Sequence, residues 1–168
     1  FLDIYLLKGA GKSGNLYKNN GDLTFTDVTE QAGVGNYAIG LGIGAADYDN
    51  NGDTDLLVTN YGDSRLHRNN GDETFTDVAE KAGLYGGPPL VAHAAFSDID
   101  NDGFLDLLLI NYVDYQPDKK VHAGALSKRE GFHFFAGPLD YDPVEQNLFH
   151  NNGDGTFTEI TKIAGLHK

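Results

Sequence analysis

The sequence predicts an all-β fold made of β-propeller blades, each with four antiparallel strands, here a partial propeller of about three blades. Three observations lead to this class. A unit of about 50 residues recurs along the chain, which is the length of a propeller blade. Within the unit, short runs rich in Val, Ile, Thr, Tyr and Phe alternate with turn residues. Glycine is abundant, with 22 among 168 residues, as expected for a chain with many turns.

The repeat has two halves. One half occurs at residues 15–34, 65–84 and 147–166, as NLYKNNGDLTFTDVTEQAGV, RLHRNNGDETFTDVAEKAGL and NLFHNNGDGTFTEITKIAGL. The other occurs at 47–61 and 98–112, as DYDNNGDTDLLVTNY and DIDNDGFLDLLLINY. The opening FLDIYLL matches its end, so that Asp3 aligns with Asp106. We therefore expect a partial blade 1 (residues 1–33), blade 2 (41–84) and blade 3 (91–168, with an insertion at 114–145). A propeller closes with about 4–8 blades, so we expect the remaining blades in a longer chain.

Each blade contains four predicted strands. In blades 2 and 3 the first strands span 41–46 and 91–97, the second 56–60 and 107–111, the third 66–68 and 148–150, and the fourth 74–78 and 156–160. Asn-Asn-Gly-Asp between the third and fourth strands predicts a hairpin, because Asn and Gly tolerate positive φ. After the fourth strand of blade 1, residues 29–33 predict one helical turn, with Thr29 as its cap and Gly33 as its end. The glycines of the first strands let these strands approach one another closely.

The loop between the first and second strands is strongly acidic. Both complete copies follow the pattern D-x-D-x-[DN]-G-x-x-D. Alternating oxygen donors, a glycine at the turn and a closing carboxylate suit a hard cation such as Ca²⁺, and carbonyls at the seventh position add backbone oxygens. An EF-hand is excluded because the glutamate at position 12 is missing and a strand follows the loop. The absence of cysteine, and of histidine within the loops, disfavours zinc and copper.

The loops, the DLLVTNYG segment and LHRNNGDETFTDV together resemble FG-GAP/VCBS repeats, the blades of integrin α-type propellers. Among these, the sequence is most similar to secreted proteins of the ASPIC/UnbV type, over nearly the whole chain except about residues 114–145. The resemblance implies two Ca²⁺ sites in the loops. The implied ligand positions are Asp47, Asp49, Asn51, Asp53 and Asp55 in one loop and Asp98, Asp100, Asp102, Phe104 and Asp106 in the other. Asn51 departs from the acid that is common at its position, which weakens that site.

Two alternatives to a calcium site stay open for the loops. A solvated Asp/Asn/Gly turn accounts for a single copy, but two copies at the same place in a repeat favour a cation that offsets carboxylate repulsion. A catalytic carboxylate pair is disfavoured because catalysis needs one site and not one per blade. The histidines of the third strands, His67 and His150, are treated as equivalent to Tyr17, and packing is favoured over metal binding for both.

The insertion at 114–145 carries basic residues and several aromatic residues. Long loops on a rigid scaffold often carry function. Because blade strands are antiparallel, we expect the insertion on the face opposite the acidic loops. It either binds a partner or covers the blade with its aromatic residues, and we favour covering.

The net charge of -13 excludes nucleic acid as a partner, since phosphates require Lys and Arg. No apolar run approaches the length of a membrane span, so we expect no membrane insertion. We expect a calcium-binding scaffold or binding platform that is secreted or at the cell surface, with a periplasmic location as an alternative, and with an unidentified protein or glycan partner. We expect no enzymatic activity in this chain. The competing functions are part of a propeller enzyme acting on polysaccharide, and an adhesion module for protein partners.

Overall fold

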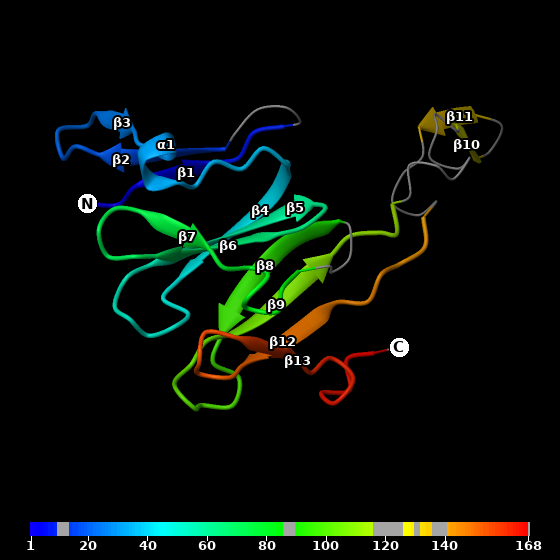
Figure 1. Ribbon diagram of the computed structural model, residues 1–168. Helices are drawn as coiled ribbons and strands as arrows, with labels where there is room; N and C mark the ends of the chain where they lie inside the picture. Colours follow the sequence, from blue (N-terminus) through cyan, green and yellow to red (C-terminus); the bar gives the residue numbers. More distant parts are fainter. Residues whose placement is uncertain (10–13, 86–89, 116–125, 130–131, 136–140, 168) are drawn as a thin grey trace.

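The computed structural model describes residues 1–9, 14–85, 90–115, 126–129, 132–135 and 141–167, and these are almost entirely β-strand and turn. Three antiparallel sheets form the body (Figure 1). The first sheet contains β1 (Ile4–Leu6), β2 (Asn15–Asn19) and β3 (Phe25–Asp27). The second contains β4 (Ile39–Ala46), β5 (Asp55–Tyr61), β6 (Arg65–Asn69) and β7 (Phe75–Asp77). The third contains β8 (Val91–Ser97), β9 (Asp106–Asn111), β12 (Asn147–Asn151) and β13 (Phe157–Glu159). The predicted fold class is confirmed: these sheets are β-propeller blades.

Each complete blade is a meander in which neighbouring strands pair in sequence order. Strand β5 pairs with β4 on one side and with β6 on the other, and β6 pairs with β7. The third sheet repeats this order, although the 114–145 segment separates β9 from β12. The second strands are the most buried elements: β5 buries every residue except Tyr61, and β9 buries four of its six residues.

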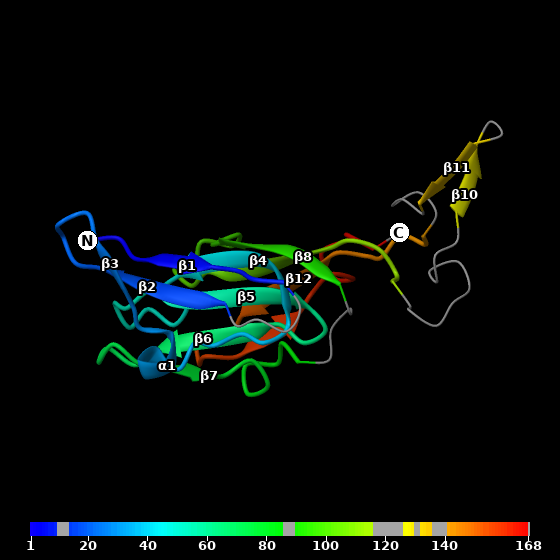
Figure 2. The ribbon, with the colours of Figure 1, turned by 90° about the horizontal axis from the view of Figure 1, so that it is seen from above.

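The blades lie face to face, as the view from above shows (Figure 2). A core cluster between blades 2 and 3 includes Leu57, Leu107 and Phe149. Glycine permits the closest approach, where β4 meets β8. A Cβ added at Gly42 would lie 2.7 Å from the carbonyl oxygen of Ala92, so no larger residue fits without moving a strand. The glycine-rich first strands therefore serve close packing, as predicted.

The Asn-Asn-Gly-Asp hairpins are closed by the same side-chain network in each repeat. In blade 2, Asn70 Nδ2 donates to Thr74 Oγ1 at 2.9 Å, and the Thr74 N–H donates to Asp72 Oδ1 at 3.1 Å. The Gly71 N–H donates to Asn69 Oδ1 at 3.0 Å. Equivalent bonds occur at Asn20–Thr24 and Asn152–Thr156. The recurrence of these letters in the sequence is explained by turn chemistry.

Helix α1 (Thr29–Ala32) is one turn long and ends at Gly33, which has a φ of 73°. The expectation that Thr29 caps this helix is wrong, because Val28 occupies the N-cap and makes no side-chain cap bond. Thr29 is instead buried within the helix, and its Oγ1 accepts the Leu16 N–H at 2.9 Å. Thr29 therefore ties the turn to β2.

The inserted segment begins and ends in ordered structure at the end of blade 3 away from the acidic loop (Figure 1). Val113 and Pro143 form a β-bridge, and the ring of Tyr115 contacts those of Tyr61 and Tyr141. Between them, β10 (Leu126–Arg129) and β11 (Phe132–Phe135) pair as a hairpin apart from the blades in both views (Figures 1 and 2). The rest of the insertion, including His122, lies outside the described residues. Within the described part of the chain, no helix is long and apolar enough to cross a membrane.

Candidate metal centre

The two acidic loops join the first strand of a blade to the second, and they fold in the same way. In blade 2, Asp47 accepts the N–H groups of Asn51 (3.0 Å) and Gly52 (2.9 Å). In blade 3, Asp98 accepts those of Asp102 (3.2 Å) and Gly103 (3.1 Å). These bonds pull the chain into a tight turn around the first carboxylate.

The turn needs two residues with positive φ in each loop. In blade 2 these are Asn50 at 56° and Gly52 at 93°, and in blade 3 they are Asn101 at 63° and Gly103 at 92°. Only Gly, and less readily Asn, adopts this region at little cost. The Asn at the fourth position and the Gly at the sixth position of each loop therefore specify the backbone conformation of the turn.

In blade 2 the carboxylates of Asp47, Asp49 and Asp55 converge. One oxygen from each lies within 4.8 Å of the other two. Two oxygens on opposite sides of a Ca²⁺ ion are about 4.6–5.2 Å apart, since each bond is about 2.3–2.6 Å long. The Oδ1 atom of Asp49 is buried and has no hydrogen-bond partner among the described residues. A buried oxygen without a donor is what a bound cation would satisfy, so the residues present fit Ca²⁺.

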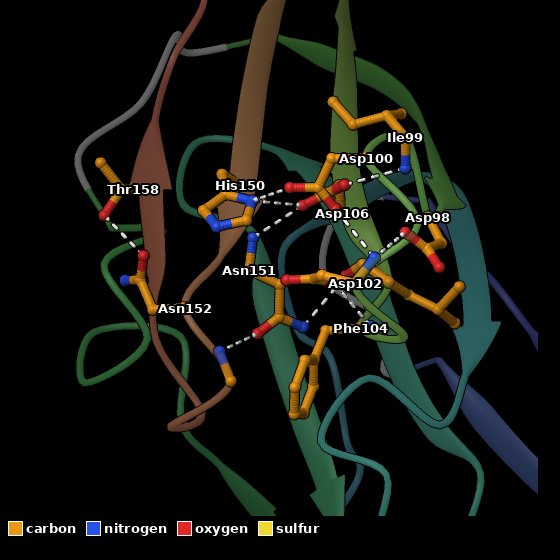
Figure 3. A network of polar contacts seen from close by, with 12 residues as sticks. Asp98, Ile99, Asp100, Asp102, Phe104, Asp106, His150, Asn151, Asn152 and Thr158 are labelled. Atoms are coloured by element: carbon orange, nitrogen blue, oxygen red, sulfur yellow. Dashed lines mark hydrogen bonds and ion pairs between the residues drawn. The ribbon is translucent and has the colours of Figure 1, made fainter.

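In blade 3 the carboxylates of Asp98, Asp100 and Asp102 converge within the same limit. Asp100 also belongs to a second group, with Asp106 and His150, whose ligand atoms again lie within 4.8 Å of one another. Figure 3 shows the imidazole of His150 pointing at Asp100 and Asp106. Blade 3 therefore presents an all-oxygen group and a group with one nitrogen, sharing Asp100.

The last carboxylate of each loop is buried and holds the loop to the third strand. Asp55, which is 2% exposed, accepts the Tyr48 N–H at 3.1 Å and the Asn69 N–H at 2.8 Å. Asp106, which is 1% exposed, accepts the Ile99 N–H at 3.0 Å and the Asn151 N–H at 2.9 Å. In each case one donor lies in the loop and the other in the third strand. These two residues thus act as structural clamps in addition to their predicted place as ligands.

Burial raises the pKa of Asp55 to about 6. The two N–H groups that it accepts oppose this rise, and the charges of Asp49 and Asp47 add to it. Without an ion, the ionised loop is therefore electrostatically unfavourable near neutral pH. A divalent cation among these carboxylates would remove this cost.

The remaining predicted positions lie around these groups. Asn51 Oδ1 accepts the Asp53 N–H at 2.7 Å, and Asp102 Oδ1 accepts the Phe104 N–H at 2.8 Å. The Asp53 side chain points toward the hairpin at Gly71, and the Phe104 ring lies against Gly153. Neither side chain belongs to the converging groups, and the expected contribution of their carbonyl oxygens stays a prediction.

The treatment of His67 and His150 as equivalent is wrong. In the strand pairing, His67 lies opposite Asp77 and Phe149 lies opposite Glu159, whereas His150 lies opposite Thr158. His67 therefore corresponds to Phe149, and His150 corresponds to Arg68, which lies opposite Thr76. The correct correspondence can be read from the sequence by aligning RLHR (65–68) with NLFH (147–150) letter by letter.

The two histidines accordingly have different surroundings. His67 is 3% exposed, and neither of its ring nitrogens has a hydrogen-bond partner among the described residues. Burial lowers its pKa. It packs as expected, whereas His150 lies beside Asp100 and Asp106 of the acidic loop and not in the core.

The fold and loops define a repeat protein of propeller blades with an acidic turn between the first two strands of each complete blade. The family model described as FG-GAP-like repeat matches residues 1–58 and 47–109. These matches cover more than half of the chain, which therefore belongs to the FG-GAP-like repeat family. No match was found among curated proteins.

Proposed function

We propose that this chain is a calcium-binding FG-GAP repeat module that serves as a scaffold and binding platform. The observation that carries the proposal is the convergence of three carboxylates in each complete loop, together with a buried Asp49 oxygen that has no hydrogen-bond partner in the described part of the chain. The repeated turn keeps like charges together, and a chain gains stability from such a turn only if a cation neutralises it.

Calcium fits the blade 2 loop better than softer ions. Its converging donors are oxygens from Asp47, Asp49 and Asp55, and Ca²⁺ takes 6–8 oxygen ligands in flexible geometry. The Asp53 carbonyl, the Asn51 side chain and water are the sources of the further oxygens. Mg²⁺ requires stricter octahedral geometry and shorter bonds, which a loop of this width supplies less readily.

The role of calcium in this proposal is structural. Each loop joins two strands of its blade, and its last carboxylate also holds the third strand. A bound ion would stabilise the folded blade by mass action. The insertion begins at the opposite end of blade 3, so a partner bound there would not contact the ions (Figure 1).

We further propose that the protein is secreted or displayed at the cell surface and that it binds a protein or glycan partner without catalysing a reaction. Extracellular calcium supports sites with Kd of about 10⁻⁴–10⁻³ M, which are too weak for the cytosol. The lack of cysteine is compatible with either compartment. The insertion is the proposed contact surface, in place of the covering role favoured from its aromatic residues, because its β10–β11 hairpin lies apart from the blades (Figure 1). Long loops on rigid scaffolds commonly carry binding residues.

Thermal unfolding with and without calcium tests the structural role. An ion at about one hundred times its Kd stabilises by about 2.7 kcal/mol per site. Two sites at about 2–4 °C per kcal/mol give a rise in Tm of roughly 10–20 °C over the chelated protein, with a smaller rise for Mg²⁺. The double variant Asp49→Asn, Asp98→Asn should lose most of this rise. Glu80→Gln removes an exposed charge outside the loops and should keep it. An unchanged Tm after chelation of protein shown to hold metal contradicts the proposal.

A further inference from the structure

His150 is brought to the blade 3 loop by β12. Its Nδ1 lies 3.0 Å from Asp106 Oδ1 and 3.5 Å from Asp100 Oδ2 (Figure 3). Asp106 is buried, whereas the side chains of His150 and Asp100 are 32% and 48% exposed. The group therefore has one rigid, buried carboxylate and two ligands that an ion can reach from solvent.

These separations are those of ligands around a small transition metal. Nitrogen and oxygen ligands lie about 2.0–2.2 Å from Zn²⁺. Two ligands at about 2.1 Å are about 3.0 Å apart along an octahedral edge and about 3.4 Å apart along a tetrahedral edge. The two distances from the imidazole are close to such edges, and the ligand atoms of the whole group lie within 4.8 Å of one another. An ion could therefore contact all three donors after an adjustment of the exposed Asp100 side chain.

Blade 2 lacks this arrangement, although its fold is the same. The residue corresponding to His150 is Arg68, and a guanidinium donates hydrogen bonds but has no lone pair for a metal. Arg68 Nη2 donates to Asn70 Oδ1 of the hairpin at 3.5 Å. The converging donors of blade 2 are all carboxylates. The two complete acidic loops therefore differ in one candidate ligand: blade 3 has the imidazole nitrogen of His150, and blade 2 has no equivalent nitrogen ligand.

Ligand type determines which ion each version prefers. Imidazole suits zinc, copper, iron and nickel, whereas Ca²⁺ favours oxygen. His nitrogen and Asp oxygen are both zinc ligands, so one imidazole and two carboxylates, completed by water, supply the four ligands of a zinc site.

We propose that blade 3 binds a zinc-class divalent ion through Asp100, Asp106 and His150, and that this ion displaces Ca²⁺ from blade 3 only. The proposal refines the metal-binding function proposed above, since both ions need Asp100. The two complete loops would then be an unlike pair, with Ca²⁺ in blade 2 and Zn²⁺ in blade 3.

Equilibrium dialysis with metal quantification tests this on the whole chain. The protein is saturated with Ca²⁺ and then dialysed against micromolar Zn²⁺ in the continued presence of Ca²⁺. The wild type should take up one Zn²⁺ and release one Ca²⁺. His150→Arg places the blade 2 residue in blade 3 and should lower Zn²⁺ affinity at least about tenfold. His150→Gln should do the same without the added charge.

His93→Arg is the matched control, because His93 is exposed on β8 and belongs to none of the converging groups. It should leave Zn²⁺ uptake unchanged. The ¹⁵N shifts of the His150 ring should move on Zn²⁺ addition and stay in place with Ca²⁺, which a hydrogen-bonded His–Asp pair alone would not produce. Circular dichroism verifies that each variant is folded.

The outcomes separate this inference from the calcium function. If the protein binds no Ca²⁺ in the first step but then takes up Zn²⁺ in a way that depends on His150, the zinc site is supported and the calcium function is contradicted. Two bound Ca²⁺ ions with no Zn²⁺ uptake overturn the zinc site alone. Equal Zn²⁺ uptake by the wild type and both His150 variants also overturns it.

Discussion

Replacement of Asp106 by Asn tests whether the last carboxylate of the loop is a structural clamp. The Asp106 carboxylate accepts the Ile99 N–H on Oδ2 and the Asn151 N–H on Oδ1. Its Oδ1 also lies 3.0 Å from His150 Nδ1, and an amide oxygen in that place keeps this contact. Asparagine has only one acceptor oxygen, so one of the two backbone N–H groups would face an NH₂ group instead. Asp106→Asn therefore removes one of the two backbone hydrogen bonds and weakens the other, with almost no change in volume.

The expected cost follows from these two bonds. An unpaired buried donor costs about 1–3 kcal/mol, and a hydrogen bond that loses its charged acceptor weakens by about 1 kcal/mol. The sum is about 2–4 kcal/mol, which lowers Tm by roughly 4–16 °C in a domain of this size. The melts are run in EDTA, so that lost ion binding does not contribute.

Asp102→Asn is the matched control for this experiment. Asp102 is exposed, and its carboxylate accepts the Phe104 N–H. An amide oxygen can make the same bond, as Asn51 already does for the Asp53 N–H at 2.7 Å in blade 2. The control should lower Tm by less than about 2 °C. Equal effects of the two substitutions would refute the clamp.

Two further predictions concern the contacts between blades. Gly42→Ala should destabilise the fold by about 1–3 kcal/mol, because its Cβ would meet the Ala92 carbonyl. Gly9→Ala is the control, since no described atom lies within 4 Å of a Cβ added there. Equal urea midpoints for the two variants would contradict close packing of β4 on β8. Burial lowers the pKa of His67, so as the pH falls His67 is protonated in the unfolded chain before it is protonated in the folded one. Protonation therefore favours unfolding. The contribution of neutral His67 to folding stability is complete above about pH 6.5 and declines below it. His67→Phe, which introduces the residue present at Phe149, should reduce the loss of stability between pH 7.5 and pH 5 measured by urea unfolding, and an unchanged loss would show that His67 is not its source.

Much of the fold could be predicted from the sequence because the signals are local. The strand expected at 91–97 coincides with β8, and the acidic turns form where the Asp-Asn-Gly pattern placed them. The hairpins close as expected because Asn, Asp and Thr bond to groups only a few residues away. Local patterns of this kind specify turns whatever the rest of the chain does.

The parts that could not be predicted depend on strand register. The contact of His150 with Asp106 spans 44 residues, and a shift of one position turns a side chain to the other face of a strand. The equivalence expected for His150 and His67 is a separate error, because aligning RLHR with NLFH already places His150 at the position of Arg68. Thr29 differs from expectation for a related reason: its hydroxyl bonds to Leu16 of β2 and not to the helix that it was expected to cap.

The clamps also make each proposed ion site depend on the order in which the strands of its blade pair. Asp55 is complete only when β6 has joined β5 across 14 residues of sequence, and Asp106 is complete only when β12 has joined β9 across 45 residues. Closing the longer loop costs about 1 kcal/mol more in chain entropy. A doubling of the segment between β9 and β12 should therefore lower the folding stability of blade 3 by about 0.6 kcal/mol, with every candidate ligand unchanged. The length of a loop at one end of the blade would then tune the stability of the acidic turn at the other.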